Sequence, residues 1–85
     1  MEVVWQSRAW EDYLYWQSHD KRILKRVNDL IKDSLRNPFN GIGKPEPLKG
    51  NLSGFWNRRI TDEHRLVYAV HDGRLHILQC RFHYG

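Results

Sequence analysis

Apolar side chains recur every three or four residues between Lys21 and Arg36, and this spacing predicts an amphipathic α-helix. The apolar positions are Ile23, Leu24, Val27, Leu30, Ile31 and Leu35. The basic residues of this segment fall outside the stripe, so they are expected to face solvent. Asn37-Pro38 predicts the end of the helix, because a residue that precedes proline disfavours helical backbone angles.

A shorter helix is predicted just before this one. Its residues at helical spacing are Trp10, Tyr13, Leu14 and Gln17. Ser7 is of a type that caps helix N-termini and is expected to do so here. The pair His19-Asp20 interrupts the pattern, and Asp20 is placed to cap the second helix. Because so short a joint connects them, the two helices are predicted to form an antiparallel hairpin.

Strand patterns occupy both ends of the chain. Residues 2–5 form a short β-branched and aromatic run, and further strands are predicted over residues 55–60, 65–71 and 74–82. The segment 38–54 holds three prolines and four glycines and is expected to be loop without a regular element. The order predicts a single α+β domain over residues 1–85. It has a short N-terminal strand, a helical hairpin and a three-stranded antiparallel meander, with the helices packed on one sheet face.

The turns between the last strands decide which side chains share a face. A loop of odd length at residues 61–63 places Arg59 directly opposite Arg65, where like charges destabilise a sheet by roughly 0.2–1 kcal/mol. An anion between the two arginines would favour such a pair. Alternatively, both arginines point to solvent beside the acidic residues of the turn.

The last hairpin turns at Asp72-Gly73. A two-residue loop would place His83 on the face opposite Arg65, because side chains alternate along a strand. A three-residue loop over residues 71–73, with glycine in the left-handed third position, places them on the same face. The three-residue loop is predicted, and it aligns Arg59, Arg65, Arg81 and His83 on one face toward the loop that carries Glu46.

Composition and charge narrow the class of protein. The 85 residues carry a net charge of +4, most of it in the second half, which suggests an anionic partner such as nucleic acid. The single cysteine, Cys80, excludes an internal disulfide and fits a reducing compartment. No apolar run approaches the length of a membrane span and no signal peptide opens the chain, so a cytoplasmic protein without membrane association is expected.

One glutamate, several cations and one histidine are what metal-free cleavage of RNA requires. The 2′-hydroxyl of RNA needs a base, the pentavalent phosphate needs cations, and the leaving 5′-oxygen needs a proton donor. Glu46 stands between Pro45 and Pro47, which hold it on a stiff, extended stem. His83 suits acid–base chemistry at neutral pH. The plainer readings are a solvated surface glutamate and an exposed chain end.

A metal site is the rival interpretation for the histidines. These residues are His19, His64, His71, His76 and His83. They show no metal-binding motif spacing and only one cysteine accompanies them, so neither a metal nor another cofactor is expected.

Three stretches, EDYLYWQ, GKPEPLKGNLSGFWNRRITDEHRLVYAV and CRFHY, carry a resemblance to YoeB-type toxins of the RelE/ParE superfamily that spans essentially the whole chain. The resemblance implies a RelE-like fold and a ribosome-dependent mRNA endonuclease that acts in the A site of the 70S ribosome. It implies that Glu46 is the general base, His83 the general acid and Arg65 the residue that stabilises the phosphate. Lys49 and Arg59 would add positive charge, and Tyr84 would help to position the RNA. A YefM-like antitoxin is implied as partner, and a homodimer is left open.

The basic face of the second helix is interpreted as a docking surface for ribosomal RNA, or else as a solvated helix face. Its residues are Lys21, Lys25, Lys32 and Arg36. Two other functions remain as alternatives. A gyrase-directed toxin of the same superfold would not need Glu46, Lys49 and His83 together. A noncatalytic RNA-binding or repressor module would use the basic sheet without an acid–base pair.

Overall fold

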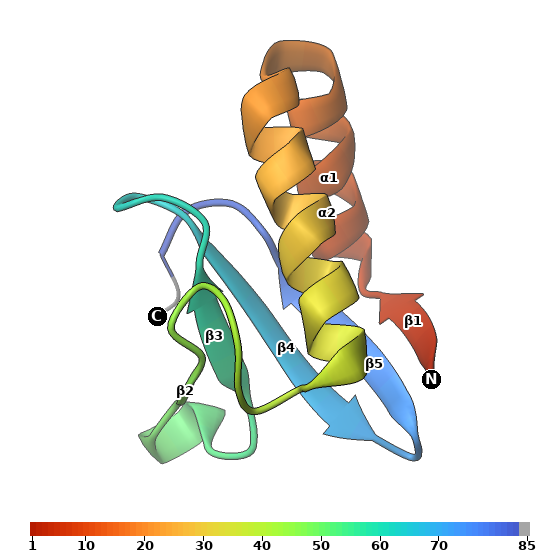
Figure 1. Ribbon diagram of the computed structural model, residues 1–85, viewed down its shortest axis with the longest axis vertical. Helices are drawn as coiled ribbons and strands as arrows, with labels where there is room; N and C mark the ends of the chain where they lie inside the picture. The colour runs from red at the N-terminus through yellow and green to blue at the C-terminus, as the bar shows by residue number, and fades with distance from the viewer. Residues whose placement is uncertain (84–85) are drawn as a thin grey trace.

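The computed structural model describes residues 1–83 and confirms the α+β class (Figure 1). The elements are, in chain order, β1 (Glu2–Trp5), α1 (Ser7–His19), α2 (Lys21–Arg36), β2 (Glu46–Pro47), the 3₁₀ turn η1 (Gly50–Leu52), β3 (Trp56–Arg59), β4 (Arg65–His71) and β5 (Arg74–Gln79). The two helices lie side by side as the predicted antiparallel hairpin (Figure 1).

The described strands form one five-stranded sheet in the order β1-β5-β4-β3-β2. The predicted meander is its centre. β1 adds to one edge, parallel to β5, and β2 adds to the other edge, antiparallel to β3. The expectation that residues 38–54 hold no regular element was therefore wrong. The buried side chain of Leu48 anchors this segment, and its N–H donates to the carbonyl of Phe55 at 2.9 Å, which brings β2 against β3.

Helix boundaries follow the sequence pattern closely. The side chain of Asp20 accepts hydrogen bonds from the backbone N–H groups of Arg22 and Ile23, so its predicted capping role is confirmed. The capping role of Ser7 was wrong, because Ser7 is the first helical residue and Gln6 precedes it as the N-cap. The Gln6 side chain forms no capping hydrogen bond, and its backbone carbonyl accepts the first intrahelical bond from Trp10.

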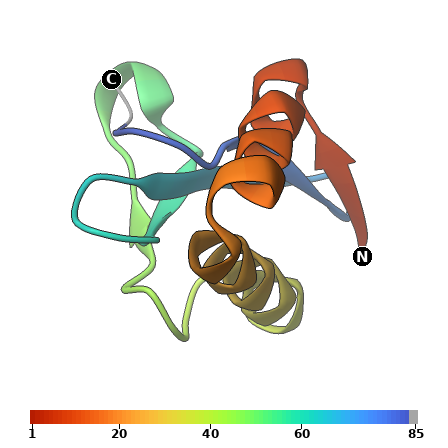
Figure 2. The same cartoon turned by 90° about the horizontal axis from the view of Figure 1, so that it is seen from above.

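The hydrophobic core lies between the helical hairpin and the central strands. It draws Ala9 and Trp16 from α1, Val27, Leu30 and Ile31 from α2, and Leu66, Tyr68, Leu75 and Ile77 from β4 and β5. The side of the sheet that faces the helices is thus covered by the core. Seen from above, residues 80–83 and η1 lie on the side of the strands opposite α2 (Figure 2).

Of the two turns of the meander, the first has the predicted register and the second does not. Arg59 pairs with Arg65, as predicted. The last turn holds two residues rather than three, because His71 pairs with Arg74 and both Asp72 and Gly73 have positive φ, as a type I′ turn requires.

A two-residue turn alone would place Gln79 on the face opposite Arg65. A β-bulge in β5 corrects this by shifting the register of the strand. Tyr68 pairs with Ile77, whereas the preceding Val67 pairs with Gln79, so Leu78 is the extra residue. A bulge shifts the register by one position. Gln79 therefore lies on the face of Val67 and Arg65.

Strand β5 ends at Gln79, three residues earlier than predicted. The cause is helix α1, which takes both backbone groups of Cys80. The carboxylate of Asp12 accepts the Cys80 N–H at 3.1 Å, and Trp16 Nε1 donates to the Cys80 carbonyl at 2.8 Å. Arg81 then places its guanidinium 3.5 Å from the centre of the Tyr15 ring. Arg81 therefore packs against α1 and does not join the arginines on the sheet, contrary to the prediction.

Candidate functional site

The sheet face that carries the predicted site contains one continuous row of paired residues. Glu46 pairs with Asn57, Asn57 with Val67, and Val67 with Gln79. Directly paired residues point to the same face, and strands are ~4.8 Å apart, so the row spans roughly 14 Å. Arg59 lies on the same face, two positions along β3 from Asn57. The structure therefore brings Glu46 and the two arginines of the β3–β4 pair onto one surface.

Glu46 stands at the outer end of this row, on the edge strand β2. Its backbone is extended and its side chain is exposed, as expected from the two flanking prolines. Glu46 and Lys49 line the same hollow of about 340 Å³, together with Leu48 and Leu52. A carboxylate and an ammonium group are thus available at one opening in the surface.

Arg59 and Arg65 contact different groups of the turn between β3 and β4. Arg65 Nη1 donates to the turn carbonyls of Thr61, Asp62 and His64. Arg59 Nη1 lies 3.6 Å from the exposed carboxylate of Asp62, a contact of little energetic weight. Within residues 1–83, Nε and Nη2 of Arg65 form no hydrogen bond. An anionic group between the two arginines would be attracted to both.

His83 is exposed, and its backbone is tied to the far end of the row. Its carbonyl accepts a hydrogen bond from Gln79 Nε2 at 3.1 Å, and Gln79 is the last member of the row that begins at Glu46. The general acid and the general base implied by the resemblance are therefore connected to the two ends of one row on a sheet face, with the buried residues Asn57 and Val67 between them. Tyr84 lies outside the described residues.

Arg58 is a residue whose role the sequence analysis missed. Its side chain has no solvent exposure and forms an ion pair with Asp33 at 2.6 Å. It also donates to the carbonyls of Asn37, Asn40 and Ile42, which fixes the loop that leads to β2. The hydrogen bond from Arg58 holds the pKa of Asp33 below its usual value. Strand alternation was the available signal, since Arg58 must face the core if Arg59 faces outward.

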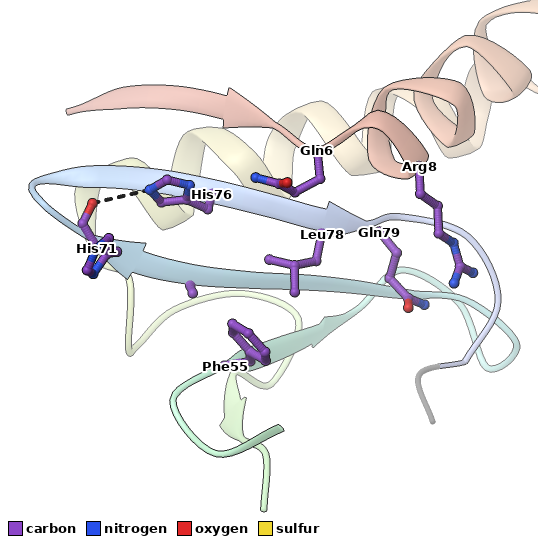
Figure 3. Close-up of a pocket in the computed structure, with 8 residues that line it drawn as sticks. Gln6, Arg8, Phe55, His71, His76, Leu78 and Gln79 are labelled. Atoms are coloured by element: carbon purple, nitrogen blue, oxygen red, sulfur yellow. Dashed lines mark hydrogen bonds between the residues drawn. The ribbon is translucent and has the colours of Figure 1, made fainter. Parts of the chain in front are cut away.

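A second hollow of about 540 Å³ continues across the sheet from Gln79 (Figure 3). His71 and His76 lie at its end near the β4–β5 turn, and Arg8 lies beside Gln79 at the other end (Figure 3). The remaining lining residues are Gln6, Phe55, Ala69 and Leu78. No local pattern in the sequence indicates this hollow, because its lining residues come from segments that are distant in sequence.

The basic residues of α2 lie away from this surface. Lys21, Lys25, Lys32 and Arg36 are all exposed, and α2 is on the side of the strands opposite residues 80–83 (Figure 2). Lys25 pairs with Asp29 at 2.9 Å along the helix. The structure thus places the helix that carries these cations across the strands from residues 80–83.

Within residues 1–83, no cluster of three or more His, Cys, Asp or Glu side chains has the arrangement of a metal site. In the same range, neither helix has the length and apolar character that crossing a membrane requires.

Comparison with known proteins places these features in a family. A family model described as "YoeB-like toxin of bacterial type II toxin-antitoxin system" matches residues 5–84. Toxin YoeB of Escherichia coli (strain K12) is 66% identical over 84 residues, which cover 99% of this chain and 100% of that protein. The solved YoeB/ParE toxin from Agrobacterium tumefaciens has a TM-score of 0.97 at 53% identity, covering 99% of this chain and 100% of the other. A YoeB–YefM heterotetramer and a YoeB dimer from Staphylococcus aureus each give a TM-score of 0.91 at 47% identity, covering 99% of this chain and 98% of the other.

Proposed function

This chain belongs to the family of YoeB-like toxins of bacterial type II toxin–antitoxin systems, and from that membership we propose that it is a ribosome-dependent endoribonuclease that cleaves mRNA in the A site of the 70S ribosome. The observation that carries the proposal is the directly opposed pair Arg59 and Arg65 on the sheet face that also presents Glu46. Two like charges at such a position are unfavourable until an anion binds. A phosphodiester of RNA is that anion.

The proposed reaction uses only groups of the protein and the RNA. Glu46 removes the proton of the 2′-hydroxyl, whose oxygen attacks phosphorus while the bond from phosphorus to the 5′-oxygen breaks. His83 donates a proton to that leaving oxygen. Arg65 stabilises the charge of the pentavalent phosphate, with further positive charge from Lys49 and Arg59. The products are a 2′,3′-cyclic phosphate and a free 5′-hydroxyl, and no metal or cofactor takes part. Tyr84 is assigned to positioning of the RNA.

Dependence on the ribosome follows from the layout of the site. Glu46 and His83 are both exposed side chains at the edges of a small surface, so the protein by itself holds RNA loosely. Positioning of the substrate by the ribosome would supply the missing orientation, which can lower a barrier by several kcal/mol. The basic face of α2 is the proposed docking surface for ribosomal RNA, since it is exposed and separate from the catalytic groups.

Protein partners are inferred from the solved relatives. The Staphylococcus aureus complex supports a YefM-like antitoxin as the partner that blocks this site, and the dimer from the same organism supports a homodimer.

Single-turnover cleavage of an mRNA positioned in the A site of purified 70S ribosomes tests the proposal. Glu46→Gln and His83→Gln should each reduce the cleavage rate ~10²–10⁴-fold, the usual contribution of a general acid or base. Glu11→Gln on the exposed side of α1 is the matched control and should leave the rate unchanged. Near-normal rates for both site variants would refute the acid–base assignment.

Two further outcomes separate the alternatives. Equal cleavage of naked RNA and ribosome-bound RNA would contradict the dependence on ribosomes. If Glu46→Gln still arrests translation and no new mRNA ends appear with the wild-type protein, the chain is a noncatalytic RNA-binding module instead.

A further inference from the structure

Phe82, the residue before His83, has an unusual backbone conformation. Its φ is +65°, in the left-handed region that side chains with a Cβ rarely adopt. Both of its backbone groups are bound. The N–H donates to His64 Nδ1 at 2.7 Å, and the carbonyl accepts from the Arg65 N–H at 3.1 Å and from Gln79 Nε2 at 3.4 Å. A disfavoured conformation persists where its surroundings hold it in place, and such residues cluster at functional sites.

His64 supplies the contact that holds the N–H of Phe82. Its ring packs edge-on against Trp16, with ring centres 4.8 Å apart, and lies 5.7 Å from the ring of Phe82. Because Nδ1 accepts a hydrogen bond, the imidazole must be neutral with its proton on Nε2. The ring is therefore both fixed in orientation and committed to one protonation state.

We propose that His64 is a positioning residue for RNA cleavage: its neutral imidazole holds Phe82 in the left-handed conformation that presents His83, and protonation of His64 releases this segment. The proposal rests on the function assigned above to His83. His64 does not contact the reacting atoms in this scheme. It acts through the backbone between Phe82 and His83.

The chemistry of the contact makes the arrangement sensitive to pH. A proton on Nδ1 would turn the acceptor into a donor that faces the N–H of Phe82, and the hydrogen bond would be lost. The backbone hydrogen bonds left on Phe82 would then be those to its carbonyl, and the backbone could return to a more common conformation. The fraction of molecules with His83 in the active position would fall, and the cleavage rate would fall with it.

The charged groups around His64 act on its pKa in both directions, and burial is the largest influence. Burial lowers the pKa of His64 from its usual value of 6.5. Glu63 and Asp12 act in the opposite direction, whereas Arg81 and His83 add to the lowering. The lowered pKa means that His64 is neutral at pH 7 and becomes protonated only in more acidic solution. Release of the segment is therefore expected on the acidic side of the reference value.

Two substitutions at His64 separate its hydrogen bond from its charge. In His64→Asn, the side-chain oxygen stands close to the position of Nδ1 and can accept from Phe82, but it does not titrate. His64→Ala removes the acceptor. His71→Asn, at an exposed position by the β4–β5 turn, is the matched control. Cleavage of ribosome-bound mRNA is measured in single turnover from about pH 5 to 8, with ribosome binding and urea unfolding measured in parallel.

At neutral pH, His64→Ala should cleave roughly five- to tenfold more slowly than wild type, the effect expected when one neutral hydrogen bond is lost. His64→Asn should cleave within about twofold of wild type, and His71→Asn should match it. Ribosome affinity should be the same for all. In acidic solution, the rate of His64→Asn should fall less than that of the wild type. An unchanged rate for a folded His64→Ala would refute the positioning role, and identical acidic profiles for wild type and His64→Asn would refute the release.

A readout without catalysis distinguishes this proposal from the function on which it rests. The backbone amide resonance of Phe82 in the ¹⁵N-labelled protein should shift with a midpoint below 6.5 in wild type, and that transition should be absent in His64→Asn. A Phe82 resonance that does not respond to pH refutes the contact even if the protein cleaves mRNA. The opposite result is also informative. If the Phe82 resonance shifts with pH in the wild type but Glu46→Gln cleaves mRNA as fast as the wild type, the contact is supported and the function assigned above is refuted.

Discussion

Replacement of Arg58 by methionine tests whether a buried ion pair fixes the loop that leads to Glu46. The Arg58 side chain is 0% exposed, and its guanidinium lies 2.6 Å from the carboxylate of Asp33 and 3.1 Å from the hydroxyl of Tyr68. Three loop carbonyls accept its remaining hydrogen bonds. Methionine retains an unbranched apolar stem but removes every one of these contacts.

The loss of stability expected for Arg58→Met depends on how well its former partners can be hydrated. Removal of one member of a buried ion pair costs about 3–5 kcal/mol, because the other member is left uncompensated. The Asp33 side chain is 24% exposed and can be rehydrated, and the loop residues Asn37, Asn40 and Ile42 are themselves exposed. The lower end of the range therefore applies, about 3 kcal/mol. A domain of 85 residues has a total stability of roughly 4–13 kcal/mol, so the loss should be large.

Urea unfolding followed by tryptophan fluorescence measures this loss. With a slope of about 1–3 kcal/mol per molar urea, the midpoint for Arg58→Met should fall by roughly 1–3 M. Asp33→Asn is the companion variant. It retains an oxygen that can accept from Arg58, but it leaves the buried guanidinium without a carboxylate. A change below about 1 kcal/mol for Arg58→Met would refute the reasoning, because it would mean that water replaces all of these contacts.

Three further outcomes are expected. Gly43→Ala should lower the thermal midpoint in calorimetry by several degrees, since φ is +79° there and a Cβ would lie 2.6 Å from Leu30 Cδ2; an unchanged midpoint would contradict the close packing. The pKa of Asp33 is lowered from 3.8 by its arginine partner, so its contribution to stability is present above pH 3.8 and is lost as the pH falls through the lower, folded-state value. The free energy of unfolding of Asp33→Asn should accordingly decrease less steeply with falling pH than that of the wild type, and equal slopes for the two proteins would exclude the effect. The double variant Lys21→Glu and Lys32→Glu should weaken ribosome binding at low salt and reduce its salt dependence, whereas unaltered binding would rule out docking through α2.

Local rules predicted the helices and one of the two turns from the sequence. The stripe of apolar residues predicted α2, and Asn37-Pro38 predicted its end. Asp20 was identified as its cap because a single side chain and two nearby N–H groups decide that role. The opposition of Arg59 and Arg65 required only the parity of a short loop. The candidate site residues came from the resemblance and from the unusual placement of Glu46 and His83, and their assigned roles stay predictions.

The errors arose where distant residues compete with local preference. Asp72-Gly73 suits both a two-residue and a three-residue turn, and the bulge at Leu78 has no signal of its own in the sequence. The early end of β5 is set by Asp12 and Trp16, which lie more than sixty residues before Cys80 and take its backbone groups. No pattern within residues 74–83 reports the presence of these two side chains.

The parallel pairing of β1 with β5 has a mechanical consequence. When the chain is pulled at residue 1 and residue 83, the force enters β1 at its first residue and β5 at its last. Because these two strands run in the same direction, the load acts along them and in opposite senses. The rungs from Glu2–Arg74 to Trp5–Ile77 then bear the load together, in shear, instead of opening one after another. Residues 1 and 83 are thus joined through strands in a geometry that resists stretching, and tension on both residues must break these backbone pairs together before β1 and β5 can separate.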